Sequence, residues 1–223
     1  MSTLTRVELN ERFKDGTAKG LVLTPILSQK QLGDASIDVR LANQFIVFRA
    51  HTLDAFDPYK QGTTNLRKMQ QRQVIPYGQP FVLHPGSLSL GATFEYLSMP
   101  NDLECQVEGR SSWARLGLQV ATATAVEPGF KGVITLELSN VGTIPIVLRP
   151  GVRIAQLVFR TTSSPVEAPY KGSRKYVCPI GPQFSRIHTD KDGQVFASRQ
   201  CAPLTLSPVL SFASRSAGTL GDA

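Results

Sequence analysis

The chain has 223 residues, of which 41% are hydrophobic, and a formal net charge of +7 at pH 7. This composition supports a core and argues against wholesale disorder, while the scattered positive charges favour a small phosphorylated ligand over polymeric nucleic acid. No apolar run is long enough to span a bilayer, so we expect no membrane partner. Three cysteines without C-x-x-C spacing, and an N-terminus without an apolar signal core, predict a cytoplasmic protein.

The N-terminal part of the chain predicts one helix and one strand. Residues 5–14 carry three apolar side chains among charged ones, which is typical of a short helix, and Gly16 is expected to end it. Residues 21–25 form a short apolar run that predicts a strand. We expect the helix to pack against one end of the β structure rather than to take part in chemistry.

Residues 37–48 predict a longer strand. Asp38 and Arg40 alternate there with apolar side chains, so both charges fall on one face, and we interpret them as a buried structural network. Residues 53–73 are polar and contain the run Gly-Thr-Thr-Asn, which indicates a surface insertion or a short helix.

Further strand signals then recur with Pro-Gly turns beside them. Residues 81–86 predict a strand and a turn, and residues 87–96 alternate apolar and polar side chains, as a half-buried strand does. Pro-Gly pairs stand at 85–86, 128–129 and 150–151. Many short strands with such turns predict an antiparallel sandwich or barrel, and the lack of a fixed period argues against a solenoid.

An acid stands in the middle of the strand predicted for residues 133–140. Glu137 alternates with Leu136 and Leu138, so its side chain falls on the face opposite to theirs. A carboxylate among apolar neighbours is costly unless it is paired or has a function. Glu137 is therefore the first candidate for a reactive group.

A cluster of donors precedes that strand. Arg110, Ser111, Ser112 and Arg115 lie in a turn between two glycines. Guanidinium groups fork onto phosphate oxygens, and serine hydroxyls and turn N–H groups add donors. We interpret the cluster as an anion-binding cradle with the carboxylate nearby. An equally open alternative is a loop whose arginines pair with surface acids while Glu137 simply faces solvent.

The C-terminal part contains two segments of different character. Residues 170–176 combine basic, aromatic and glycine residues, which predicts a flexible lid that folds over phosphates. Toward its end the chain becomes rich in Ser, Ala, Pro and Leu with little charge. We expect a single domain over residues 1–190 and a C-terminal extension of unknown role over residues 191–223.

Several segments carry a family resemblance, and they are residues 35–41, 48–52, 109–117, 127–140, 150–159, 175–176, 181–182 and 185–187. In this order they resemble the successive motifs of dCTP deaminase, a family of the trimeric dUTPase superfamily. The resemblance implies a mostly β fold: a distorted antiparallel β-barrel or jelly roll of the dUTPase type, with a short N-terminal helix and few other helices. It also implies a homotrimer whose active sites are shared between subunits.

The resemblance implies zinc-independent hydrolytic deamination of dCTP to dUTP and ammonia. Zinc deaminases need H-x-E and P-C-x-x-C motifs, which this chain lacks, so a positioned general base must activate the water. Glu137 matches the family's catalytic glutamate, and Ser111 and Arg115 would hold and polarise the groups around that water. We expect Mg²⁺ on the nucleotide phosphates, with no zinc and no metal site built from protein ligands.

The family's substrate contacts fall on a larger set of positions, which are Arg110, Ser111, Ser112, Trp113, Ala114, Arg115, Ala123, Glu127, Thr135, Leu136, Glu137, Tyr170, Lys175 and Pro179. Arg110 and the two serines would bind phosphates. The hairpin that contains Ala123 would read the pyrimidine through its backbone groups. Tyr170 and Lys175 would close over the triphosphate.

Three positions depart from the family pattern. The hairpin at residues 121–126 is one residue shorter than usual, Glu127 stands where an aspartate is common, and Pro179 replaces a glutamine that contacts substrate. Two alternatives therefore stay open beside the monofunctional deaminase. One is a bifunctional enzyme that also cleaves the triphosphate to dUMP and diphosphate, and the other is a nucleotide-binding sensor without turnover.

Overall fold

The computed structural model describes residues 2–49, 56, 68–121, 125–170, 172 and 174–190. The chain divides into two compact units, Met1–His188 and Thr189–Ala223, and the architecture below is that of the first. The boundary expected at residue 190 stays a prediction. The elements of the chain are α1 (Arg6–Lys14), β1 (Val22–Thr24), η1 (Gln29–Gln31), β2 (Ile37–Arg40), β3 (Gln44–Phe48), β4 (Gln70–Val74), β5 (Phe81–Leu83), β6 (Leu88–Ala92), β7 (Tyr96–Ser98), β8 (Leu103–Gly109), α3 (Ser111–Ala114), β9 (Leu118–Ala121), β10 (Lys131–Gly132), β11 (Thr135–Asn140), β12 (Ile146–Leu148), β13 (Arg153–Thr161) and η2 (Ile187–Thr189).

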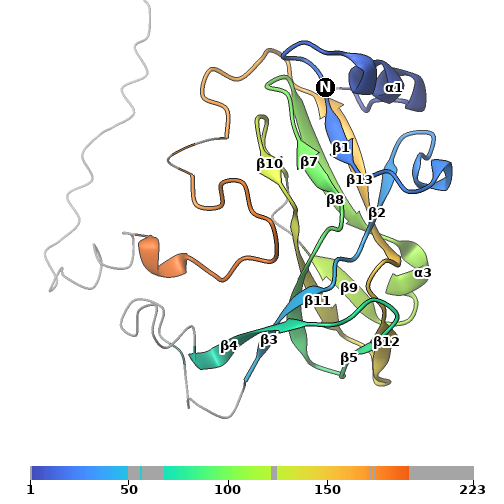
Figure 1. Ribbon diagram of the computed structural model, residues 1–223, viewed down its shortest axis with the longest axis vertical. Coiled ribbons are helices and arrows are strands. Elements are labelled where there is room, and N and C mark those ends of the chain that lie inside the picture. Colours follow the sequence, from blue (N-terminus) through green and yellow to red (C-terminus); the bar gives the residue numbers. More distant parts are fainter. Residues whose placement is uncertain are drawn as a thin grey trace, which may run out of the picture. The chain divides into compact units, whose positions relative to one another are not determined.

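Within the described residues the strands form four antiparallel sheets, which confirms the mostly β fold that the sequence predicts (Figure 1). The largest has the order β4-β3-β6-β11-β9, and the others have the orders β2-β13-β8, β1-β7-β10 and β12-β5. Among the described residues the sheets do not close into one continuous barrel, in keeping with the distorted form expected. All three predicted Pro-Gly turns are present, each with its glycine at positive φ.

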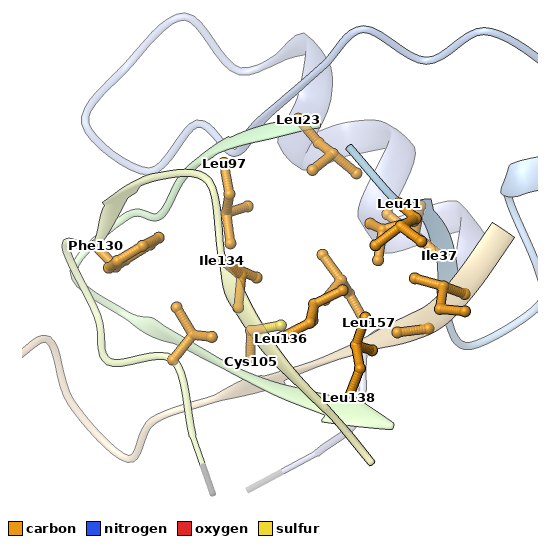
Figure 2. Close-up of a cluster of buried hydrophobic side chains, with 14 of the residues drawn as sticks. Leu23, Ile37, Leu41, Leu97, Cys105, Phe130, Ile134, Leu136, Leu138 and Leu157 are labelled. Atoms are coloured by element: carbon orange, nitrogen blue, oxygen red, sulfur yellow. The ribbon is translucent and has the colours of Figure 1, made fainter. Parts of the chain in front are cut away.

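The hydrophobic core lies between the sheets (Figure 2). Leu136 and Leu138 point into it from β11, where they meet Leu157 of β13 and Cys105 of β8. All four side chains are completely buried. The alternation along residues 133–140 therefore predicts the faces of β11 correctly, since the residues between these leucines turn away from the core.

The predicted N-terminal helix is present as α1, and its first turn is held by a local acid. The Glu8 carboxylate accepts hydrogen bonds from the Thr5 backbone N–H at 2.7 Å and from its hydroxyl at 2.8 Å. The expected glycine stop is wrong. The helix ends at Lys14, the next residue Asp15 is extended with φ −74° and ψ 109°, and Gly16 is not left-handed.

Two strand predictions need correction in the N-terminal half. The strand expected over residues 37–48 is interrupted after Arg40 and continues as β3, so one predicted strand serves two different sheets. The polar residues 70–73, expected in a surface insertion or a short helix, form most of β4, which pairs with β3 along its whole length. Residues 57–67 of the same stretch lie outside the described part of the chain.

The alternation over residues 87–96 also describes two strands, β6 and β7, and its buried face is not the expected one. In β6, Ser89 is buried and Leu88 is exposed. Gly91 lies on the buried face, where an added Cβ would meet side-chain atoms of Leu41 at 2.9 Å and Leu138 at 3.1 Å. Small residues face the core because large side chains from other elements already fill it. The leucines of β6 face the pocket described below.

Candidate active site

Glu137 stands on the outward face of a central strand. β11 runs between β6 and β9, and Glu137 lies opposite Leu90 on one side and Ala121 on the other. Its side chain is exposed although both sequence neighbours are fully buried. Within the part of the chain that the structure describes, no ion pair or hydrogen bond reaches its carboxylate. The acid is thus free to bind water or a ligand.

A pocket of about 630 Å³ opens beside this carboxylate. It is lined by Phe48, Phe56, Met69, Gln70, Leu88, Leu90, Ala125, Val126, Glu127, Phe130, Val133, Ile134, Thr135, Glu137, Tyr170, Tyr176, Pro179, Gln183, Ser185 and Ile187. Five of the residues predicted from the sequence therefore meet at one cavity. They are Glu127, Thr135, Glu137, Tyr170 and Pro179. A largely apolar wall with few polar groups is typical of a small-molecule site.

The predicted lid region lies against this pocket, next to β10 (Figure 1). The Val133 N–H donates to the Pro179 carbonyl at 2.9 Å, and the Gln183 N–H donates to the Thr135 hydroxyl at 3.2 Å. The ring of Tyr170 packs on Phe130 with centroids 5.7 Å apart. The described residues 163–170, 172 and 174–187 are called the covering segment below, and they are hydrogen-bonded to Val133 and to Thr135 of β11.

Gly132 makes the closest approach of this covering segment possible. A Cβ at Gly132 would lie 2.3 Å from Cδ of Pro179, and the residue has φ +138°, which L side chains rarely adopt. Pro179, which departs from the family pattern, is therefore seated directly on β10. Lys175 does not line the pocket, whereas Arg174 pairs with Glu127 at 3.5 Å.

The Arg-Ser cluster forms the short helix α3 and stands apart from Glu137. Ser111, Ser112, Ala114 and Arg115 are exposed, and none of them lines the pocket. α3 leads into β9, whose first residue lies opposite Asn140, about 10 Å along β11 from Glu137 at the usual rise per residue. Figure 1 shows α3 on the opposite side of the strands from the covering segment. One chain therefore does not bring the cradle and the acid together.

Arg110 and Trp113 are tied to neighbouring strands. Arg110 forms an ion pair with Asp38 at 3.4 Å, and the Trp113 indole N–H donates to the Arg153 carbonyl at 2.9 Å. By contrast, the guanidinium of Arg115 has no ion pair within the described ranges. Of the remaining predicted residues, Leu136 points into the core, and Ala123 lies outside the described part of the chain.

The buried network expected around Asp38 and Arg40 exists, but these residues do not form an ion pair with each other. Arg40 donates to the Gln31 side chain at 3.3 Å and to the Gly151 carbonyl at 2.8 Å. Asp38 instead forms ion pairs with Arg110 and with Arg153, the latter at 2.8 Å. Alternation identifies the shared face, but the true partners lie on other strands.

Glu95 is a buried acid in the network around Asp38 and Arg40, and its place there was not predicted from the sequence. It is completely buried, and its carboxylate accepts hydrogen bonds from the Gln31 side-chain amide at 2.8 Å and from the Arg40 backbone N–H at 2.8 Å. Burial raises the pKa of Glu95 above its ordinary value, although these hydrogen bonds oppose the shift. Its place on the polar side of residues 87–96 was the available signal.

Among the described residues, no group of three or more His, Cys, Asp or Glu side chains could hold a metal ion. In the same part of the chain, no helix has the length and apolar character needed to cross a membrane.

The fold and the site define a mostly β protein that presents an acid in a pocket and a separate basic turn suited to anions. Residues 3–162 match the family of dCTP deaminase-like proteins. The chain belongs to this family.

Relatives with known names support the assignment. The dCTP deaminase, dUMP-forming, of Methanosphaera stadtmanae is 38% identical over 196 residues, which cover 86% of this chain and 97% of the relative. The enzyme of the same name from Dictyoglomus thermophilum is 44% identical over 174 residues, 76% of this chain and 88% of its own. The crystal structure of 2'-deoxycytidine 5'-triphosphate deaminase from Agrobacterium tumefaciens matches with a TM-score of 0.55 and 26% identity. That match covers 72% of this chain and 48% of the solved chain.

Proposed function

We propose that this protein is a hydrolytic deaminase of dCTP that uses Glu137 as its general base. The observation that carries the proposal is the position of this carboxylate, which is exposed and unpaired at a largely apolar pocket in the described structure. A base in that position can take a proton from water and keep it close to the reacting atoms. Membership of the dCTP deaminase-like family supplies the class of substrate.

The chemistry follows from one carboxylate and one water. Glu137 removes a proton as the water oxygen bonds to C4 of cytosine, and the proton passes to N3. The C4 hydroxyl then loses its proton to the carboxylate, which delivers it to the exocyclic nitrogen as the C4–N bond breaks. Ammonia leaves, the ring gains a 4-oxo group in place of the amino group, and the carboxylate returns to its starting state.

We propose that the protein is a homotrimer and that α3 of a neighbouring subunit completes the active site around Glu137. Within one chain, α3 does not line the Glu137 pocket, so Ser111 and Arg115 can act there only from another copy. Exposed apolar side chains next to α3 support such an assembly, since Leu116, Val141 and Ile144 are 62%, 69% and 74% exposed. Closed symmetry with heterologous contacts would give three equivalent shared sites.

Mixing two impaired variants tests this sharing. Glu137→Gln and Arg115→Gln proteins are each expected to lose most of their activity. Co-refolded at equal amounts, they should regain about a quarter of the wild-type rate, because a wild-type pair then meets at one interface in four. No recovery, or a monomer by light scattering, contradicts the shared site.

The remaining predicted residues receive roles in binding. Arg110, Ser111 and Ser112 would hold phosphates, and Tyr170 and Lys175 would cover them. The hairpin around Ala123 would read the base. Mg²⁺ would bind together with the nucleotide, since phosphate oxygens and water suffice to hold it. The protein would work in the cytoplasm.

Release of dUMP is the second candidate, and the names of some relatives favour it, whereas those from Halorubrum lacusprofundi and Haloarcula marismortui are called dCTP deaminase alone. The proteins from M. stadtmanae and D. thermophilum are both called dUMP-forming. Glu127 is a second acid at the same pocket. It could direct a water to the α-phosphorus, whose bond to the bridging oxygen would break as diphosphate leaves.

A product assay decides between the candidates. The pure protein is incubated with dCTP and MgCl₂, the nucleotides are separated, and ammonia and diphosphate are measured. Ammonia with dUTP indicates deamination alone, whereas ammonia with dUMP and diphosphate indicates both steps. Tight dCTP binding without ammonia would overturn both and identify a nucleotide-binding sensor.

A further inference from the structure

Asp38 is a buried carboxylate shared by two arginines. Its Oδ1 lies 3.4 Å from Nε of Arg110, and its Oδ2 accepts a hydrogen bond of 2.8 Å from Nη1 of Arg153. Gln156 donates to Oδ1 at 3.1 Å, and Asp38 is only 7% exposed. A carboxylate this buried is satisfied by charge and hydrogen bonds from three directions, so its position is well defined.

Arg153 is the direct neighbour of the predicted phosphate-binding turn. It begins β13, and the Arg110 guanidinium donates to its carbonyl at 3.4 Å. The single tryptophan of the chain, Trp113 in α3, donates to the same carbonyl. The turn that carries the two serines is thus attached to Arg153 through its backbone and, by way of Asp38, through its side chain.

Both arginines keep donors for a ligand. A guanidinium has five N–H groups. Arg153 uses Nη1 for Asp38 and for the Lys30 carbonyl, which leaves Nε and Nη2 without a partner in the described structure. The side chains of Arg110 and Arg153 are 26% and 32% exposed. Two arginines against one aspartate leave one net positive charge at this surface.

We propose that Arg153 is a second phosphate-binding arginine beside Arg110, and that Asp38 is the positioning residue that holds both guanidiniums in place. The ligand is the triphosphate of a nucleotide, so the inference rests on the proposed function and adds a residue to it. Guanidiniums held by a buried acid do not lose their rotamer freedom on binding, which lowers the entropic cost of gripping an anion.

Substitution of Arg153 tests the first half of the proposal. Binding of dCTP and of inorganic tripolyphosphate is measured by calorimetry, with unfolding midpoints as a check on folding. Arg153→Gln is expected to raise both dissociation constants about 10- to 100-fold, the scale of a hydrogen bond between charged groups. Arg160→Gln is the matched control, since Arg160 lies on the same strand with similar exposure but opposite Glu104. It should leave both constants unchanged.

Substitution of Asp38 tests the second half through the sign of the effect. Asp38→Asn removes a negative charge close to the ligand, and by electrostatics alone this would strengthen anion binding. A positioning role predicts the opposite, a rise of about tenfold in the dissociation constant for tripolyphosphate while the protein stays folded. Fluorescence of Trp113 should shift as well, because its indole is tied to this cluster.

The outcomes are separable from those of the proposed function. Tripolyphosphate binding needs no turnover, so weaker binding by Arg153→Gln supports the proposal even if wild-type protein releases no ammonia. Unchanged binding by Arg153→Gln with a lower unfolding midpoint would make the pair purely structural and overturn it. Tighter binding by Asp38→Asn would overturn the positioning role, and a wild-type protein that binds neither probe overturns the whole inference.

Discussion

Beside α3, Arg110 and Arg153 are both paired with Asp38, whereas Glu137 on the outer face of β11 has no such partner among the described residues. The buried Gln31 side chain donates to the Asp38 carbonyl and to the Glu95 carboxylate, which adds to the network around Asp38. Glu137, by contrast, is exposed. A cation that grips a phosphate gains from being held still, while a general base must exchange protons with a substrate and cannot be tied up in an ion pair.

This contrast also separates stability from activity. Residues that are already paired in the folded protein without ligand contribute to stability as well as to activity, because their removal leaves a buried partner unsatisfied. Exposed residues without partners can be changed at little cost to folding. We therefore expect substitution of Glu137 to reduce activity with little effect on stability, and substitution of the paired residues Asp38 and Arg110 to reduce both.

The largest expected effect is that of Glu137→Gln. The side chain is exposed, so the unfolding midpoint should stay within the range of surface substitutions. Turnover of dCTP should fall at least about 100-fold, because an amide cannot take the proton from water. Glu108→Gln is the control, since Glu108 is also an exposed acid on a strand. Ammonia release at the wild-type rate from Glu137→Gln would refute the role given to this residue.

Arg115→Gln separates the two kinds of arginine at α3. Arg115 is exposed and has no ion pair among the described residues, so its loss should leave the unfolding midpoint unchanged. The value of kcat/KM for dCTP should fall about 10- to 100-fold, as for the loss of a charged hydrogen bond to the reacting site. Arg110→Gln should lower both, because Asp38 then loses a partner. Equal stability loss in the two variants would contradict the contrast.

The sequence predicts the reactive strand well because alternation is a local property. It correctly divides β11 into a buried face with Leu136 and Leu138 and an outer face with Glu137. The same rule misjudges β6, since alternation identifies which side chains share a face but not which face the rest of the chain covers. Gly91 faces the core there because Leu41 and Leu138 fill the space.

Contacts between distant parts of the chain escape such rules. Asp38 and Arg153 are separated by 115 positions, so no spacing in the sequence pairs them. β4 is polar along most of its length, and its composition predicts a surface insertion or a short helix rather than a strand. It lies at the edge of its sheet, where one side needs no partner strand and apolar residues are not required. The predicted cradle and acid likewise fall in separate places, which local patterns cannot reveal.

Gly132→Ala breaks the contact between β10 and the covering segment. The new Cβ would meet Pro179 at 2.3 Å and would also strain the backbone at φ +138°. We expect the segment to detach, with faster proteolysis between residues 163 and 187 and a fall in kcat/KM of roughly tenfold. Gly16→Ala provides the control, since nothing lies within 4 Å of its added Cβ. A Gly132→Ala protein with unchanged resistance to proteolysis and unchanged activity would mean that the contact between Gly132 and Pro179 does not hold the covering segment.

The smallest effect is expected from Arg174→Ala, which removes the ion pair between the covering segment and Glu127. The two side chains are 47% and 48% exposed and lie 3.5 Å apart. Exposed pairs of this kind contribute about 0 to 1 kcal/mol, so KM for dCTP should change less than about fivefold. The covering segment is then held by its backbone hydrogen bonds and by the fit of Pro179 on Gly132 rather than by charge. A loss larger than that of Gly132→Ala would reverse this order and would place Arg174 in direct contact with the nucleotide.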